Sequence, residues 1–479
     1  MAIVGAFAVP HPPIMLPEVG RGEETKISTT TASYEAVADE IARLKPDTIV
    51  ISSPHSIMYA DYFHISPGKK ATGNMARFNA PQVKISADYD TELVGEICYI
   101  ADSYGSDDAK NSDIQAFPAG IEGERDPSLD HGTLIPLYYI TKKYSDFKLV
   151  RIGLSGLQLP MHYEMGQIIQ KAVNRLGRRV VYVASGDLSH KMKEDGPYGF
   201  AKEGPEYDER IMADLKSAEF GNLLSYDEVF LERCAECGHR SFVMMAGALD
   251  GLKVKGQQLS HEATFGVGYG ICRFEVGDAD NSRHFLENYR EQRIAQLSEK
   301  RRREDPYVRL ARFSLETYIT TGKRITQKDI QGKEWDDLPK EIFSEKAGAF
   351  VSIHKDGALR GCIGTILPTC SCVANEIMQN AISAGTTDPR FSAITEKELE
   401  FLEMSVDVLD EPEPVNGPEE LDVKRYGVIV TSGRKRGLLL PNLDGVDSIE
   451  QQIGIACQKA GINDGEDYTL ERFEVIRHE

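Results

Sequence analysis

The stretch KPDTIVISSPH, residues 45–55, places a helix-breaking Lys-Pro-Asp, an apolar β-branched run and a histidine in direct succession. The run at 48–52 predicts a buried strand, because short apolar segments rich in Ile and Val are typical of strands covered on both faces. The preceding residues 29–44 carry apolar side chains at helical spacing, which predicts a helix leading into the strand. A helix, a break and a buried strand in this order favour an α/β fold.

The same pattern recurs on both sides of this stretch. Apolar runs at 3–9, 149–154 and 180–184 predict further buried strands, each next to a segment with a helical pattern. Strands that alternate with helices predict a three-layer α/β domain around a central sheet. The run at 265–276 is expected to close that domain as a last strand, and its glycines do not follow the spacing of a dinucleotide-binding loop.

A change of composition follows this domain. Residues 285–303 are dense in Glu, Gln, Lys and Arg, which predicts a solvated connecting helix. Beyond it, apolar runs at 348–353 and 358–366 flank a Lys-Asp-Gly turn, and this arrangement predicts a β-hairpin. We therefore expect an α/β domain at 1–277, a connecting helix or linker at 278–304, and a separate α+β domain at 305–479.

Composition excludes several classes of partner. The 479 residues are 41% hydrophobic and 27% charged, an ordinary globular balance, and the formal net charge is −20. Such a negative charge argues against nucleic acid or an anionic membrane surface as a partner. No stretch approaches the roughly 18 apolar residues of a membrane span. The eight scattered cysteines suit a reducing compartment, so we expect a cytoplasmic protein.

Histidines follow the expected strands of the first domain. His11 comes after the first strand, His55 after the second, and His190 after the run at 180–184, while His131 lies where a helix is expected to begin. In open α/β sheets ligands bind beyond the carboxyl ends of the strands, so these side chains can converge. Any one of them could be structural, but three after separate strands indicate a metal site, because neutral imidazole is the commonest metal ligand in proteins.

Further ligands are expected in the segment CAECGH, residues 234–239, which precedes a helix predicted at 240–249. A single CxxC pair is weak support for a zinc or redox site. The start of a helix favours an anionic side chain, either Glu236 or Cys237 as a thiolate. The residues alone leave both open.

The segments PHPP (10–13), KPDTIVISSPH (45–55), DHGT (130–133) and GDLSH (186–190) together resemble the LigB-type class III extradiol ring-cleavage dioxygenases. The sequence is also similar to the Memo branch of that superfamily. The resemblance implies a 2-His-1-carboxylate Fe(II) site with His11 and His55 as ligands. It further implies that His190 is the acid/base residue for a catecholic proton, and that His131 contacts the substrate or supports a ligand.

The third ligand is where the two branches differ. The dioxygenases have Glu in the segment near 236, whereas the Memo branch has Cys followed by Gly, and this chain has Glu236, Cys237 and Gly238 in succession. Glu236 and Cys237 are the main candidates, with His239 and Glu262 as further ones. A carboxylate favours Fe(II), whereas a thiolate favours copper or zinc.

Two functions follow from this resemblance. The first is a non-haem Fe(II) oxidoreductase related to catechol dioxygenases, with a small aromatic substrate. The alternative is a Memo-like metal-binding protein without dioxygenase activity, acting with a radical-SAM protein partner.

The second domain resembles the AMMECR family through LRGCIG (359–364), DPRF (388–391) and GLLLP (437–441). The resemblance covers roughly 305–475 and implies a fold without an assigned activity. From the residues, Arg360 beside Cys362 would favour a reactive thiolate, and Asp388 and Arg390 could form a polar pair at the same face. Alternatively, Cys362 is a small buried residue and Asp388 belongs to a turn.

Overall fold

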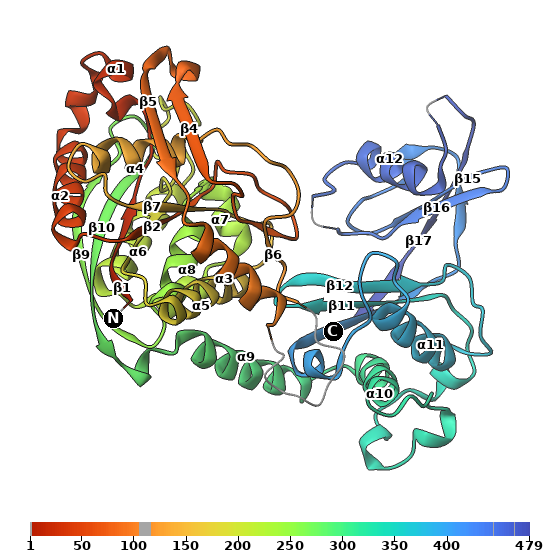
Figure 1. Ribbon diagram of the computed structural model, residues 1–479. Helices are drawn as coiled ribbons and strands as arrows, with labels where there is room; N and C mark the ends of the chain where they lie inside the picture. Colours follow the sequence, from red (N-terminus) through yellow and green to blue (C-terminus); the bar gives the residue numbers. More distant parts are fainter. Residues whose placement is uncertain (1, 105–115, 444, 464) are drawn as a thin grey trace. The chain divides into compact units, whose positions relative to one another are not determined.

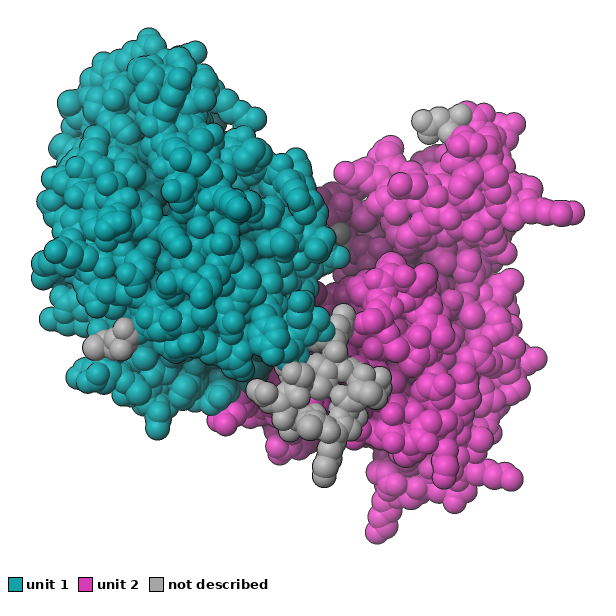
Figure 2. Space-filling model, in the orientation of Figure 1, with its two compact units in different colours: residues 1–290 teal, residues 291–479 magenta. Residues whose placement is uncertain are grey.

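The computed structural model describes residues 2–104, 116–443, 445–463 and 465–479. It divides into two compact units, Met1–Arg290 and Glu291–Glu479, which Figure 2 colours separately. Helix α9 (Phe285–Arg301) contains the point of division. The boundary expected at 278–304 stays a prediction.

The first unit is built on a six-stranded mixed sheet (Figure 1). In spatial order the strands are β7 (Lys148–Gly153), β2 (Thr48–Ser53), β8 (Val180–Ser185), β1 (Ile3–Val9), β10 (Tyr269–Ala279) and β9 (Leu252–Glu262). The first four are parallel, and β10 and β9 are antiparallel additions. The parallel strands therefore end at the same edge of the sheet.

Helices cover both faces of this sheet and make three layers. One face packs its apolar side chains against α2 (Ser28–Leu44) and α4 (His131–Thr141). The other face packs on α3 (Thr91–Asp102), α5 (Leu159–Leu176), α6 (Glu203–Ser217) and α8 (His239–Ala248). Strands β2 and β8 are buried along their whole length, which is why they form continuous apolar runs in the sequence. The predicted three-layer α/β fold is confirmed.

Smaller elements complete the first unit. They are the antiparallel hairpin β4 (Lys70–Met75) and β5 (Ala80–Asp88), the short parallel pair β3 (Phe63–His64) and β6 (Ala119–Gly120), and helices α1 (Pro17–Gly20) and α7 (Glu228–Cys234). Among the described residues, no helix is long and apolar enough to span a membrane.

The second unit contains two antiparallel four-stranded sheets. The first has the order β12 (Ala358–Gly364), β11 (Ala349–Lys355), β13 (Leu402–Leu409) and β18 (Val475–His478). The second has the order β14 (Glu413–Val415), β17 (Thr469–Phe473), β15 (Gly427–Ser432) and β16 (Lys435–Leu439). Its helices are α10 (Pro306–Thr321), α11 (Val373–Thr386) and α12 (Ile449–Ala460). The predicted α+β architecture is confirmed.

The hairpin of β11 and β12 forms where the Lys-Asp-Gly turn predicts it. Asp356 and Gly357 both have positive φ, 52° and 85°, as a tight hairpin turn between twisted strands requires. This hairpin carries Cys362 on its second strand.

Candidate metal centre

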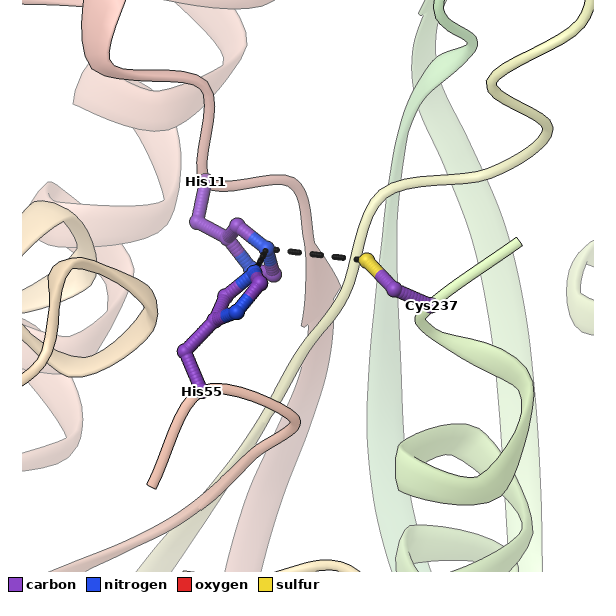
Figure 3. Close-up of side chains that lie close together, drawn as sticks. All are labelled: His11, His55 and Cys237. Atoms are coloured by element: carbon purple, nitrogen blue, oxygen red, sulfur yellow. Dashed lines mark hydrogen bonds between the residues drawn. The ribbon is translucent and has the colours of Figure 1, made fainter. Parts of the chain in front are cut away.

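Two histidines lie together where two parallel strands end. His11 follows β1 by two residues, His55 follows β2 by two residues, and β8 lies between these strands. Their Nε2 atoms are 3.0 Å apart. The Sγ atom of Cys237 lies 3.6 Å from the His11 Nε2, so three side chains from three segments converge (Figure 3).

Contact between two backbones positions Cys237. After β8 the chain passes Gly186, and a Cβ atom on that glycine would lie 2.1 Å from the Cα of Gly238. The two glycines therefore let the segment before α8 approach the end of β8 closely. Cys237 consequently lies beside Asp187, whose backbone N–H donates to the sulfur at 3.3 Å.

The three donor atoms fit a metal ion. The ligand atoms of His11, His55 and Cys237 all lie within 4.8 Å of one another. Metal bonds of about 2.05 Å to nitrogen and about 2.3 Å to sulfur in a tetrahedral arrangement separate N from N by about 3.3 Å and N from S by about 3.6 Å. The observed distances of 3.0 and 3.6 Å match that arrangement. These side chains can hold a metal ion.

Ser185 fixes which nitrogen of His11 is free to bind. The Ser185 hydroxyl donates its one proton to the carbonyl oxygen of Gly132 at 2.6 Å. It must therefore accept the 2.9 Å hydrogen bond from Nδ1 of His11. In neutral His11 the Nε2 lone pair is then unprotonated and directed towards Cys237 and His55. Such a partner on the far nitrogen is typical of histidines that bind metal.

Burial keeps the imidazoles of His11, His131 and His190 and the thiol of Cys237 neutral. It lowers the pKa of His11 well below its ordinary value, with the neighbouring His55, His131 and His190 acting in the same direction. Burial is also the main cause that lowers the pKa values of His131 and His190 to about 4. Burial, followed by the charges of nearby carboxylates, raises the pKa of the Cys237 thiol. The imidazoles are thus in the form that binds metal, and a bound cation would favour the thiolate.

His131 and His190 border the three converging side chains. The His131 ring stacks on the His55 ring, with centroids 4.0 Å apart. The His190 ring stacks on Tyr198 at 5.0 Å. The Nε2 atom of His190 is buried and has no hydrogen-bond partner among the described residues. A second group of donor atoms, from Asp187, His190 and Cys237, also lies close enough to hold an ion.

The other candidate ligands of the sequence point elsewhere. Glu236 accepts the backbone N–H of His239 at 2.5 Å, at the first residue of α8. The His239 Nε2 is 2.9 Å from the carbonyl oxygen of Leu223. Glu262 accepts both the N–H and the hydroxyl of Thr30, at 2.7 and 2.6 Å. Within the described part of the chain, none of these three candidates belongs to a group of donor atoms that could hold a metal.

His11 and His55 line a cavity of about 910 Å³, together with His131 and His190. Aromatic side chains form part of its wall, namely Phe78, Tyr198, Phe265 and Tyr269. Two further residues were not predicted: Tyr198, which reaches His190 from a loop, and Ser185, which is the last residue of β8. Ser185 could have been found from its position at the end of a predicted strand, because ligands in open α/β sheets bind beyond the strand ends.

Comparison with known proteins agrees with this architecture. Residues 5–272 match the family described as the catalytic LigB subunit of aromatic ring-opening dioxygenase, and residues 308–478 match the AMMECR1 family. Protein CA_C1420 of Clostridium acetobutylicum is 44% identical, over 100% of this chain and 99% of its own length. A protein of Thermotoga maritima is 48% identical over 36% of this chain and 98% of its own length.

Two solved structures are also similar to parts of the chain. Uncharacterized protein PH0010 from Pyrococcus horikoshii matches 36% of this chain and 88% of its own, with 32% identity and a TM-score of 0.32. Uncharacterized protein JW3007 from Escherichia coli matches 56% of this chain and 99% of its own, with 15% identity and a TM-score of 0.35. The family matches confirm both resemblances noted in the sequence: the chain belongs to the LigB family through its first unit and carries an AMMECR1 domain in its second.

Proposed function

We propose that the first unit is a metal-binding domain of Memo type, in which His11, His55 and Cys237 are the protein ligands. The position of Cys237 carries this proposal, because its sulfur lies 3.6 Å from the metal-facing nitrogen of His11. Glu236, the carboxylate that a dioxygenase-type site would use, is engaged instead at the start of α8.

The donor set limits the metal. Two imidazoles and one thiolate suit Fe(II), copper or zinc better than magnesium or calcium, which prefer oxygen ligands. Such a metal would supply redox or Lewis-acid chemistry to a molecule in the cavity. His131 and His190, both neutral, would accept and return protons at their imidazole nitrogens beside that molecule.

Metal content tests this proposal. The full chain, purified without chelators, is analysed for iron, copper and zinc by mass spectrometry. We expect close to one ion per chain, lost in Cys237→Ser and in His11→Ala. Cys234→Ser is the matched control, because Cys234 is a buried neighbour whose thiol donates to the Leu231 carbonyl at 3.1 Å. Full metal content in Cys237→Ser would contradict the proposal.

A second candidate is ring opening of a catechol by a bound Fe(II). The aromatic wall of the cavity and the proximity of His190 favour it, together with the family to which the first unit belongs. Iron-loaded protein mixed with catechols and O2 should then form yellow ring-opened products, and His190→Gln should reduce their rate. Iron-loaded protein that turns over no catechol of a broad panel would remove this candidate.

The joining of both domains in one chain supports a further part of the proposal, that they act together with a radical-SAM protein. A full-length relative shares the whole layout. Co-purification of such a protein with the tagged full chain tests this. A partner that binds equally well to Cys237→Ser would indicate that metal is not needed for assembly.

A further inference from the structure

The second unit contains a cavity of about 930 Å³, whose floor is one face of the sheet β12-β11-β13-β18. Side chains alternate along β11: Val351 and Ile353 are buried in the core with α11, whereas Ser352 and His354 line the cavity. Residues of β16 and α12 complete the wall. A volume of this size accommodates a small organic molecule.

Three small polar side chains cross this floor in one row. Cys362 of β12 is paired with Ser352 of β11, and Ser352 is paired in turn with Ser405 of β13. All three line the cavity. The Ser352 hydroxyl donates to the Cys362 sulfur at 3.3 Å, so the thiol is held at the cavity surface by a polar neighbour.

The polar pair expected from the sequence holds this strand in place. Asp388 accepts the backbone N–H of Cys362 at 2.9 Å, and Arg390 donates to its carbonyl oxygen at 3.3 Å. The two side chains also pair with each other at 2.7 Å. They satisfy the free edge of β12 as a neighbouring strand would, and they bring the Arg390 guanidinium to the rim of the cavity.

Most charges around the cavity are paired, and one cation is not. Lys300 pairs with Glu403, Arg477 with Asp407, and Arg436 with Glu471. Lys459 of α12, by contrast, has no ion-pair partner within the described parts of the chain.

Lys459 shares its surroundings with the thiol. Its pKa is lowered, chiefly because its ammonium group is partly desolvated; proximity to Cys362 opposes this change and the charge of Arg390 adds to it. A positive charge that has no ion-pair partner among the described residues therefore lies near the Cys362 thiol.

The wall near this charge is apolar. Phe350, Ile366, Leu438 and Leu440 line the cavity and pack against a small core of the second unit. A ligand that fits both surfaces has an anionic group and an apolar portion.

We propose that this cavity binds a small organic anion, with its charged group against Lys459, its apolar portion against Phe350 and Leu438, and Cys362 beside the charged group. The proposal is independent of the metal site in the first unit.

Alkylation of the full chain tests it, with peptide mapping to follow each cysteine separately. Anionic iodoacetate and neutral iodoacetamide have nearly the same size and differ in charge. We expect the rate ratio of iodoacetate to iodoacetamide to be roughly two- to fivefold higher at Cys362 than at Cys370, as one ion pair in partly exposed surroundings provides. Cys370 is the internal reference, because Glu376 accepts its N–H at 2.7 Å and repels anions.

Two further arms locate the anion. Lys459→Gln should lower the ratio at Cys362 towards that of Cys370, whereas Lys424→Gln, a change of an exposed lysine that does not line the cavity, should leave it unchanged. Benzoate or phenyl phosphate should slow alkylation of Cys362, and neutral benzamide should not. Equal ratios at both cysteines, an unreactive Cys362, or no effect of Lys459→Gln would each overturn the proposal.

Discussion

Cys237 and Cys362 are both partly buried, and Cys362 lines a cavity while Cys237 contacts His11, which lines another; their surroundings differ in the charge they favour. Cys237 faces neutral imidazoles, and nearby carboxylates oppose its ionisation. Cys362 accepts a hydrogen bond from Ser352 and lies near Lys459, which forms no ion pair with the residues that the structure describes.

The two cysteines are therefore suited to different ligands, a metal cation at Cys237 and an organic anion at Cys362. At Cys237 the missing partner is a cation, which a metal ion can supply. At Cys362 a protein cation is already present, and the missing partner is an anion.

The largest expected effect is the stabilisation of the first unit by metal. A metal present at about 100 times its dissociation constant adds about 2.7 kcal/mol to the free energy of unfolding. Denaturant unfolding of the full chain should show this gain in the wild type and in Cys362→Ser. Cys237→Ser should lose this stabilisation. If metal stabilised both variants equally, Cys237 would not be a metal ligand.

The next effect concerns Ser185, which holds the His11 tautomer. Ser185→Ala should weaken metal binding by about 10- to 100-fold, as removal of a partner on the far nitrogen of a metal-binding histidine does. Competition with a chromogenic chelator measures the affinity. Ser189→Ala is the control, since Ser189 is a buried serine of the same segment that donates to Cys234 instead. An unchanged affinity in Ser185→Ala would indicate that the tautomer is fixed in another way.

A smaller effect is expected in the second unit at Glu398. Partial burial alone would raise its pKa, but hydrogen bonds from Arg360 and Thr395 and the charge of Lys355 lower it to about 2. Because the folded pKa lies below the unfolded value of about 4.3, this stabilisation is present above pH 4.3 and is lost as pH falls towards 2.

Glu398→Gln should therefore lower the free energy of unfolding of the second unit by about 1 kcal/mol at pH 7 and by much less at pH 2.5, as measured by denaturant unfolding of the full chain. The control is Glu396→Gln, an exposed neighbour. A cost that does not change with pH would show that the Glu398 charge contributes nothing.

The sequence indicated Arg360 as the cation beside the Cys362 thiol. In the structure Arg360 is bound to Glu398 instead.

The smallest effect is predicted for Glu236→Gln. The new amide oxygen can still accept the N–H of His239, so the free energy of unfolding should change by less than about 0.5 kcal/mol. Metal content should stay at the wild-type level. Loss of the metal in this variant would indicate that the Glu236 carboxylate, and not the Cys237 thiolate, is the third protein ligand.

The sequence predicted the fold better than the site, for physical reasons. Strands β2 and β8 are covered on both faces, so burial alone dictates their apolar runs and their bounds. His11 and His55 were recognisable because each follows such a strand. Which of Glu236 and Cys237 lies beside His11 was not predictable, because this depends on the close contact of Gly186 with Gly238, which no local pattern reveals.

The cavity of the second unit was beyond prediction for a related reason. Its floor comes from one face of strands that are separated in the sequence, and Lys459 comes from a helix almost a hundred residues after Cys362. The local sequence showed Arg360 next to Cys362, whereas folding directs Arg360 to Glu398 and brings Lys459 near the thiol instead.

The most direct test of the account is X-ray absorption spectroscopy of the metal bound to the full chain. If Cys237 is a ligand, the spectrum of the wild type contains one sulfur at about 2.3 Å and nitrogen ligands at about 2.0–2.1 Å. The sulfur contribution should persist in Glu236→Gln. A wild-type spectrum with nitrogen and oxygen ligands alone would contradict the account, because the third protein ligand could then not be Cys237.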